Sequence, residues 1–287
     1  MVRRLFSLLR PLVDRFPGLA NMYRIVRNQM AFGAAPVQTP WGFKLAGNSE
    51  MAGGGFEPLE TELALKILDD VDVLVNVGAN VGYYCCHALN KGKSVVAFEP
   101  IHQNLQYLCR NIKTNGWSGV EIYPVALHNK PGVLEIYGGD TGASIIKGWA
   151  NIPESYVTLV PSSTMDIIIG DRLKGKKTLI IIDVEGAEKG VIEGASQMLA
   201  MEPKPIWMIE IVATENQAHG IEMNPDFKTI FQLFFDNGYQ AFCVDKEMNP
   251  FTMERVNDII EGRSTTTTYN YLFCQQTEQN AVNWNSI

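Results

Sequence analysis

The sequence predicts an α/β protein whose parallel sheet is covered by helices on both faces. Short apolar runs rich in Val and Ile alternate with helical segments from residue 58 onward. These runs are continuously apolar rather than alternating, which is typical of strands buried on both faces. With 287 residues, 46% of them hydrophobic and 19% charged, the chain has enough apolar material for one large domain with an N-terminal extension.

The elements are predicted in order from periodicity and turn residues. Residues 1–57 are predicted to form a basic helical extension followed by a strand and loop segment, with a short strand pair around residues 41–45. Residues 58–287 are predicted to form the main domain. Its helices are expected at residues 58–70, 83–90, 104–114, 189–200 and 227–237, and its strands at residues 73–77, 94–98, 121–127, 133–137, 179–183, 206–211, 239–244 and 269–274.

The first 27 residues carry six arginines and one aspartate, interspersed with Leu, Phe and Val. A basic amphipathic segment of this kind can lie on an anionic membrane surface. It can also pack on the main domain or on a second subunit, so peripheral contact at the inner membrane face and a homodimer both stay open. No run approaches the roughly 20 apolar residues that span a bilayer, and no cleavage site follows a proper signal-peptide core. A cytoplasmic protein is therefore expected.

Charge and metal-ligand patterns exclude other classes of protein. The net charge of −7 and the pI near 5.2 argue against a broad nucleic-acid surface, because phosphate binding needs a positive field. The five cysteines show no CxxC spacing and are expected to be buried free thiols of a reduced compartment. The four histidines are scattered, so no zinc site is predicted and no metal ligand is assigned.

A glycine-rich turn follows the first predicted strand, where parallel sheets bind their ligands. Gly78 and Gly82 permit a tight strand-to-helix turn and a close approach of a ligand to the backbone. The spacing is G-x-N-x-G rather than the G-x-G-x-x-G of dinucleotide sites. Asn80 in the middle position suits hydrogen bonding to a smaller zwitterionic group, such as the amino-acid end of a ligand.

A carboxylate stands at the end of the next predicted strand, in Phe98-Glu99-Pro100. Glu99 lies 17 residues beyond Gly82. A carboxylate at this point can accept hydrogen bonds from both hydroxyls of a ribose. Together with the glycine turn, Glu99 predicts a site for an adenosine ribose.

Further carboxylates follow two later strands. Asp183, Glu185 and Glu188 come after the strand at residues 179–183, and Glu210 closes the strand at residues 206–211. One of them can cap the following helix, but four exceed that need. They could act as a general base toward a hydroxyl or hold a hard divalent cation. The sequence leaves these two roles open.

With these motifs in view, the chain closely resembles the FkbM family of methyltransferases over residues 56–210. The blocks that carry the resemblance are Val75-Asn76-Val77-Gly78-Ala79-Asn80-Val81-Gly82-Tyr83-Tyr84, Phe98-Glu99-Pro100 with Asn104 and Asn111, Thr141-Gly142-Ala143-Ser144, Thr164-Met165-Asp166, Ile182-Asp183-Val184-Glu185-Gly186-Ala187-Glu188, Gly194-Ala195, and Ile209-Glu210. The carboxylate block after the glycine turn and the Phe-Glu-Pro element is the most specific of these.

The resemblance implies a Rossmann-like class I methyltransferase fold, with a seven-stranded, mostly parallel sheet whose last strand is antiparallel. It also implies S-adenosylmethionine as cofactor and methyl transfer, usually to an oxygen, on a small-molecule or glycan acceptor. Three positions depart from the family pattern: Asn76 replaces a common Asp, Met165 a common Leu, and Ile181 a common Lys. The residues expected to bind the cofactor are Asn76, Gly78, Ala79, Asn80, Gly82, Glu99, Pro100 and Asp183.

Asp183, Glu185 and Glu210 are nominated as catalytic bases, with Glu188 as a weaker candidate; a divalent metal is possible without being predicted. Two other functions stay open. A nicotinamide-dependent oxidoreductase uses a related sheet, but this chain lacks the third glycine of its motif. A degenerate methyltransferase fold could serve as a binding module, as the neutral Asn76 would allow. Aromatic residues such as Trp149 could stack on a sugar ring or belong to the core.

Overall fold

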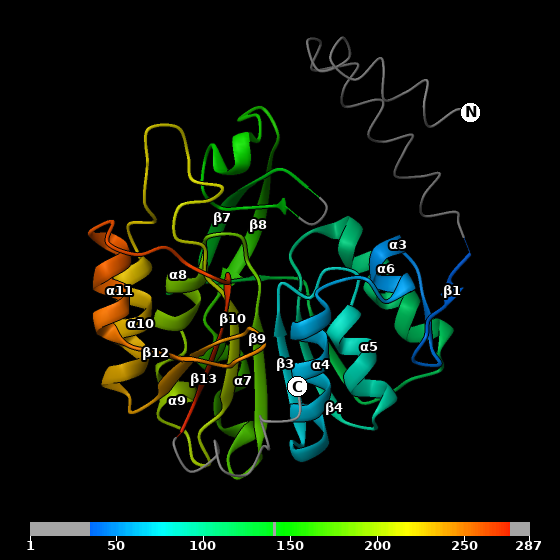
Figure 1. Ribbon diagram of the computed structural model, residues 1–287. Helices are drawn as coiled ribbons and strands as arrows, with labels where there is room; N and C mark the ends of the chain where they lie inside the picture. Colours follow the sequence, from blue (N-terminus) through cyan, green and yellow to red (C-terminus); the bar gives the residue numbers. More distant parts are fainter. Residues whose placement is uncertain (1–34, 140–141, 276–287) are drawn as a thin grey trace.

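The computed structural model describes residues 35–139 and 142–275, and these residues form a three-layered α/β arrangement (Figure 1). The large sheet has eight strands in the order β12-β11-β13-β10-β9-β3-β4-β5. Its strands are β3 (Val73–Val77), β4 (Ser94–Phe98), β5 (Val120–Tyr123), β9 (Thr178–Ile182), β10 (Ile206–Glu210), β11 (Gln240–Cys243), β12 (Pro250–Phe251) and β13 (Asn270–Cys274). The predicted α/β class is confirmed.

Strand direction also agrees with the expected class I pattern, with one difference in number. The pairs β3–β4, β4–β5, β3–β9 and β9–β10 are parallel, whereas β13 runs antiparallel to both β10 and β11. The resemblance implied seven strands, and the described sheet has eight. The additional strand is the two-residue β12, which pairs antiparallel with β11 because the chain turns back at Met248.

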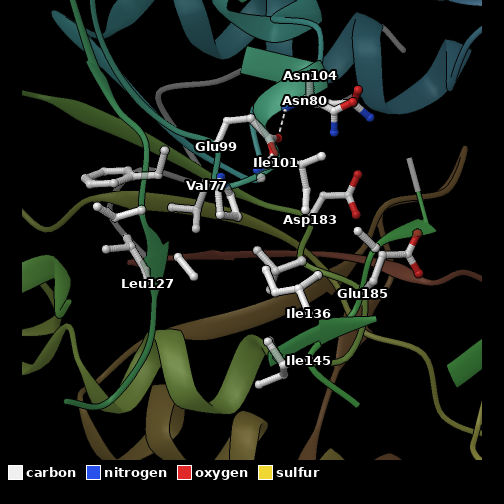
Figure 2. A pocket seen from close by; sticks show the side chains of 18 residues that line it. Val77, Asn80, Glu99, Ile101, Asn104, Leu127, Ile136, Ile145, Asp183 and Glu185 are labelled. Atoms are coloured by element: carbon white, nitrogen blue, oxygen red, sulfur yellow. Dashed lines mark hydrogen bonds between the residues drawn. The ribbon is translucent and has the colours of Figure 1, made fainter. Parts of the chain in front are cut away.

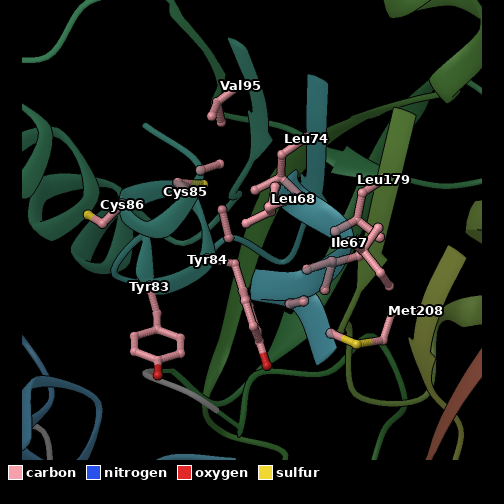
Figure 3. Close-up of a cluster of buried hydrophobic side chains, with 14 of the residues drawn as sticks. Ile67, Leu68, Leu74, Tyr83, Tyr84, Cys85, Cys86, Val95, Leu179 and Met208 are labelled. Atoms are coloured by element: carbon pink, nitrogen blue, oxygen red, sulfur yellow. The ribbon is translucent and has the colours of Figure 1, made fainter. Parts of the chain in front are cut away.

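Helices cover both faces of this sheet. One face packs against α4 (Pro58–Asp70), α5 (Tyr83–Asn90) and α6 (His102–Thr114), whose apolar residues join strand residues in one buried cluster (Figure 3). The other face packs against α7 (Met165–Ile169), α8 (Glu188–Glu193), α9 (Ser196–Leu199), α10 (Phe227–Asp236) and α11 (Met253–Ile260). All five residues of β3 and of β9 are buried, as their apolar runs predict.

The predicted continuous helix over residues 189–200 is wrong, because the structure divides it into α8 and α9. A Cβ atom at Gly194 would lie 2.2 Å from the backbone oxygen of His128, so the chain at this point is pressed against another strand end. The Gly194 carbonyl accepts a hydrogen bond from the backbone N–H of Asp166, and the Asp166 carboxylate accepts from Ser196 Oγ and Gln197 N at the start of α9. These contacts between distant segments end one helix and begin the next.

A smaller sheet projects beside the large one and contains β6 (Ala126–Leu127), β8 (Val157–Ser163) and β7 (Gly132–Tyr137), in that order. The predicted inserted strand at residues 133–137 is confirmed as β7. The extended segment predicted at residues 121–127 is divided between β5 and β6. Sequence reasoning missed β8, which pairs antiparallel with β7, and it also missed α11. The predicted strand pair near residue 41 is β1 (Val37–Gln38) with β2 (Lys44–Leu45), followed by α3 (Ser49–Gly53).

The proposed boundary at residue 57 stays a prediction. Phe43, Leu45, Met51 and Ala52, on its N-terminal side, belong to the same buried cluster as α4 and α5. The predicted basic helix lies in residues 1–34, outside the described residues. Within the described residues, no helix combines the length and apolar character needed to cross a membrane. Cys109 is exposed, the other four cysteines are buried, and all five are free.

Candidate active site

The parallel register brings the carboxyl ends of three strands to one edge of the sheet. Val77 at the end of β3 pairs with Phe98 of β4 on one side and with Ile182 of β9 on the other. The residues that directly follow these strand ends are Gly78, Glu99 and Asp183. Residues more than 100 positions apart in sequence therefore meet at the edge where parallel sheets bind ligands.

The two glycines of the turn after β3 meet different steric demands. A Cβ atom at Gly78, whose φ is 78°, would lie 1.9 Å from the backbone oxygen of Asp183, so only glycine lets these two segments meet. Gly82, with a φ of 87°, is the N-cap residue that precedes α5, and its Cβ would lie 2.4 Å from Leu108 Cδ1 on α6. Gly78 lines the cavity described next, whereas Gly82 makes room for α6 and does not line that cavity.

Glu99 is held in place by the backbone around it. Its side chain is buried, and its two oxygens accept hydrogen bonds from the backbone N–H groups of Asn80 and Ile101, each at 2.7 Å. Burial raises the pKa of Glu99 to about 7, and these two hydrogen bonds oppose the rise because they favour the carboxylate. The carboxylate is thus fixed at the tip of β4 with lone pairs left for a ligand.

An open cavity lies between the strand ends and the small sheet (Figure 2). It encloses about 640 Å³, a volume that includes the open space at its mouth. One side is polar, with Asn80, Glu99, Asp183 and Glu185. The apolar side includes Phe98, Pro100, Ile101, Val125, Leu127, Ile136 and Ile145. Asn80 Oδ1 is buried without a hydrogen-bond partner among the described residues, so it is an acceptor open to a ligand in the cavity.

Several residues predicted to bind a cofactor do not line this cavity. Asn76 is 2% exposed and accepts a hydrogen bond from Cys85 Sγ at 3.4 Å, beneath α5. It lies beneath α5 because side chains alternate along β3, which turns Asn76 toward the same face as Leu74. Ala79 is buried in the hydrophobic cluster on that face. Of the predicted cofactor residues, the cavity is lined by Gly78, Asn80, Glu99, Pro100 and Asp183.

Three carboxylates gather beside the polar end of the cavity. Oxygens of Glu57, Asp183 and Glu210 all lie within 4.8 Å of one another. This carboxylate trio has a spacing that allows the three groups to share protons or a cation. Asp183 belongs both to the trio and to the cavity lining, so the trio adjoins the space available to a ligand.

The trio is strongly perturbed electrostatically. Burial is the largest cause for each group, and repulsion from neighbouring carboxylates adds to it, while the hydrogen bond from Tyr84 opposes the rise at Glu57. Together, burial and repulsion raise the pKa of Glu57 to about 7, that of Glu210 to about 8, and that of Asp183 well above its usual range. Glu57 and Glu210 therefore take up and release protons near neutral pH, and Asp183 holds its proton to a higher pH than an exposed aspartate does.

Sequence reasoning missed Glu57. It precedes Pro58, the first residue of α4, and adopts a left-handed backbone with a φ of 40°. Tyr84 Oη donates a hydrogen bond to Glu57 Oε2 at 2.8 Å and thereby fixes the carboxylate. A Glu immediately before an N-terminal helical Pro was the available signal, but its contact with strands more than 100 residues away is set by the tertiary fold.

The two other carboxylates of the block after β9 have different environments. Glu188 is 2% exposed, and its Oε1 accepts from the backbone N–H of Gly186 at 2.9 Å, so it stabilises its own loop. Glu185 lines the cavity, and its Oε2 accepts from Trp149 Nε1 at 2.8 Å. Trp149 is 1% exposed, which places it in the core.

A family model described as "Methyltransferase FkbM domain" matches residues 76–241, more than half of the chain. The chain belongs to the FkbM methyltransferase family. The resemblance stated from the sequence blocks is confirmed. No curated protein shows significant similarity to the chain.

Solved methyltransferases share similarity with this FkbM protein at low identity. A precorrin-6y C5,15-methyltransferase from Geobacter metallireducens is 14% identical, with 63% of this chain and 70% of that chain covered and a TM-score of 0.35. An rRNA methylase from Streptococcus thermophilus is 12% identical, with 75% and 92% covered and a TM-score of 0.37. An O-methyltransferase family protein from Burkholderia thailandensis is 9% identical, with 78% and 57% covered and a TM-score of 0.36.

The three departures from the FkbM pattern all lie in the buried interior. Asn76 contacts Cys85 as described, and Met165 is fully buried against the second face of the sheet. Ile181, where the family commonly has Lys, is 3% exposed within the hydrophobic cluster of the first face. In this chain a cationic side chain at that position would be costly to bury.

Proposed function

We propose that this protein is an S-adenosylmethionine-dependent O-methyltransferase that acts on a hydroxyl of a glycan or of another hydroxylated metabolite. The observation that carries the proposal is the placement of Glu99, fixed inside a cavity whose polar end adjoins the carboxylate trio. A fixed carboxylate that suits a ribose and a cluster of potential bases that adjoins the same cavity suit a cofactor bound beside an acceptor.

The cavity residues fit the proposed cofactor. The Glu99 carboxylate offers acceptors for the two ribose hydroxyls, and the unpartnered Asn80 Oδ1 offers an acceptor for an amino or hydroxyl group. The apolar side, with Ile101, Val125 and Leu127, suits a planar base. When bound, S-adenosylmethionine supplies a methyl group made electrophilic by its sulfonium.

The chain itself supplies alignment and a proton acceptor. Confining the acceptor between Glu185 and the trio would turn a collision into an effectively intramolecular step. The proton of the acceptor hydroxyl passes to a carboxylate of the trio, and Asp183 is nominated because it also lines the cavity. Burial and neighbouring charges raise the pKa of Asp183, which makes its carboxylate a stronger base once it is deprotonated.

A shared divalent cation is the second candidate for the trio, and the mutual spacing within 4.8 Å favours it. Carboxylate oxygens are the ligands that magnesium prefers. Turnover that survives chelation of divalent ions would assign proton transfer to the carboxylates alone. Turnover that is lost on chelation and restored by magnesium would assign the trio to a cation.

The proposal is tested by calorimetry with S-adenosylmethionine and with NAD, followed by transfer of a labelled methyl group to nucleotide sugars, lipid-linked glycans and small alcohols. Binding of S-adenosylmethionine with transfer to an alcohol supports it. Binding of NAD instead would favour an oxidoreductase, and cofactor binding without transfer would favour a binding module. The same proposal includes a cytoplasmic location, formation of a homodimer and membrane contact through residues 1–27. Sedimentation with anionic vesicles tests the membrane contact.

A further inference from the structure

The segment between β7 and β8 reaches back to the loop that carries Glu185. Trp149 Nε1 donates to Glu185 Oε2 at 2.8 Å, and Ser144 Oγ donates to the backbone oxygen of Glu185 at 2.5 Å. Next to Glu185, a Cβ atom at Gly186 would lie 2.7 Å from Ile146 Cδ1 and 2.8 Å from Trp149 Cζ3. The segment therefore holds both the side chain and the backbone of this loop.

Glu185 needs such support, because its backbone has a φ of 52°. A residue other than glycine adopts this left-handed backbone conformation only where surrounding contacts hold it there. Figure 2 shows the carboxylates of Asp183 and Glu185 projecting to the same side, and both residues line the cavity. After burial, the charge of Glu185 is the largest cause of the raised pKa of Glu210, so Glu185 lies close enough to the carboxylate trio for its charge to act on it.

We propose that Trp149 is a positioning residue, whose indole N–H holds the Glu185 carboxylate toward the acceptor end of the cavity. The inference rests on the proposed function, because it assigns Glu185 to contact with the acceptor alcohol. Carboxylates bind sugar hydroxyls by accepting their protons in hydrogen bonds. A Glu185 carboxylate fixed in this way orients a hydroxylated acceptor next to Asp183.

The indole also favours the charged form of Glu185. Burial raises the pKa of Glu185, and the hydrogen bond from Trp149 opposes that rise because it stabilises the carboxylate. Replacing the indole by a phenyl ring keeps an aromatic side chain in the core but removes the donor. Trp149→Phe should therefore raise the pKa of Glu185 and release the carboxylate from its fixed direction.

Trp207 provides a matched control. It is fully buried, and its Nε1 donates to Tyr239 Oη at 3.1 Å on the opposite face of the sheet from α5. It does not line the cavity. Trp207→Phe removes a buried indole N–H hydrogen bond just as Trp149→Phe does, so it reports the effect of losing a buried indole and its hydrogen bond away from the cavity.

The test titrates the full chain, labelled with carbon-13 at the Glu carboxyls, by NMR, and assigns the Glu185 signal by its loss in Glu185→Gln. We expect the Glu185 titration to move upward in Trp149→Phe and to stay in place in Trp207→Phe. An unmoved Glu185 titration in Trp149→Phe, or an equal change in both variants, would overturn the positioning role. Should Trp149→Phe fail to fold, Ser144→Ala is titrated in its place, because it removes the hydrogen bond to the backbone oxygen of Glu185. Its Glu185 titration is then compared with that of Trp207→Phe.

Kinetics with the labelled methyl group complete the test. A carboxylate displaced by about 1 Å should lower kcat by about 100-fold, while the affinity for S-adenosylmethionine stays unchanged and the pH profile of kcat moves with the Glu185 titration. A normal kcat in Trp149→Phe would contradict the inference. Failure of the wild-type chain to bind S-adenosylmethionine would refute the proposed function instead, and the NMR titration distinguishes the two failures.

Discussion

Gly78→Ala places a methyl group where the chain has no room for one. The added Cβ would lie 1.9 Å from the backbone oxygen of Asp183 and 2.9 Å from its carbonyl carbon, while the closest tolerated approach is 3.0 Å. The obstacle is backbone rather than a flexible side chain. The turn after β3 and the residues after β9 must therefore separate by about 1.1 Å, the difference between 3.0 and 1.9 Å. Both segments line the cavity.

The expected cost has two parts. An alanine at a φ of 78° costs about 1–2 kcal/mol, because its Cβ crowds the backbone. Forcing apart packed segments adds about 1–3 kcal/mol. The free energy of unfolding should thus fall by about 2–5 kcal/mol, and a displacement of about 1 Å at Asp183 should lower turnover by about 100-fold.

Gly92→Ala separates the two parts experimentally. Gly92 has a φ of 72° after α5, and a Cβ there meets nothing within 4 Å. It should lose only the backbone cost of about 1–2 kcal/mol and keep full cofactor affinity. Urea unfolding and calorimetry measure both variants. Equal losses in Gly78→Ala and Gly92→Ala would refute the argument that β3 and β9 meet through Gly78.

Three further outcomes follow from the carboxylates. Raised pKa values mean that the folded state binds protons more tightly at the trio, so the melting temperature should fall as pH rises from about 5 toward 8. Glu210→Gln should make this fall less steep in scanning fluorimetry. A Glu210→Gln variant whose melting temperature falls as steeply as that of the wild type would contradict the expectation. Glu57→Gln should lower kcat at least about 10-fold, because it removes one carboxylate of the trio. The cofactor affinity measured by calorimetry should stay unchanged, since Glu57 does not line the cavity. Weakened cofactor binding in this variant would contradict a role for Glu57 in turnover alone. Asp166→Ala should lower the free energy of unfolding by about 1 kcal/mol, because it removes the side chain that caps α9. Asp171→Ala, at an exposed position, should lower it little, and urea unfolding measures both variants.

Local chemistry predicts the strands and part of the site well. The runs at residues 73–77 and 94–98 are strands with those bounds, because β-branched residues buried on both faces leave few alternatives. The order of the strand ends then places Gly78, Glu99 and Asp183 together through a rule of parallel sheets. The sequence alone therefore predicts that these three residues lie together.

Contacts between distant segments account for what was missed. The break after Gly194 depends on His128, and the trio depends on Glu57 meeting Asp183 and Glu210. Asn76 was expected at the cofactor because it adjoins the glycine turn, but the alternation of side chains along β3 directs it beneath α5. The contacts of Gly194 with His128 and of Glu57 with Asp183 leave no periodic signal in the sequence, whereas the alternation along β3 that directs Asn76 does.

The equilibrium affinity for S-adenosylmethionine in Glu99→Gln tests the central claim most directly, with the exposed Glu62→Gln on α4 as a matched control. The amide loses the charged acceptor for the ribose hydroxyls and turns its NH2 group toward the backbone N–H of either Asn80 or Ile101. Losing one hydrogen bond to a charged group costs about 1.5–3 kcal/mol, so the Kd should rise about 10-fold to 100-fold. A Kd in Glu99→Gln equal to that of Glu62→Gln would contradict a cofactor bound in this cavity.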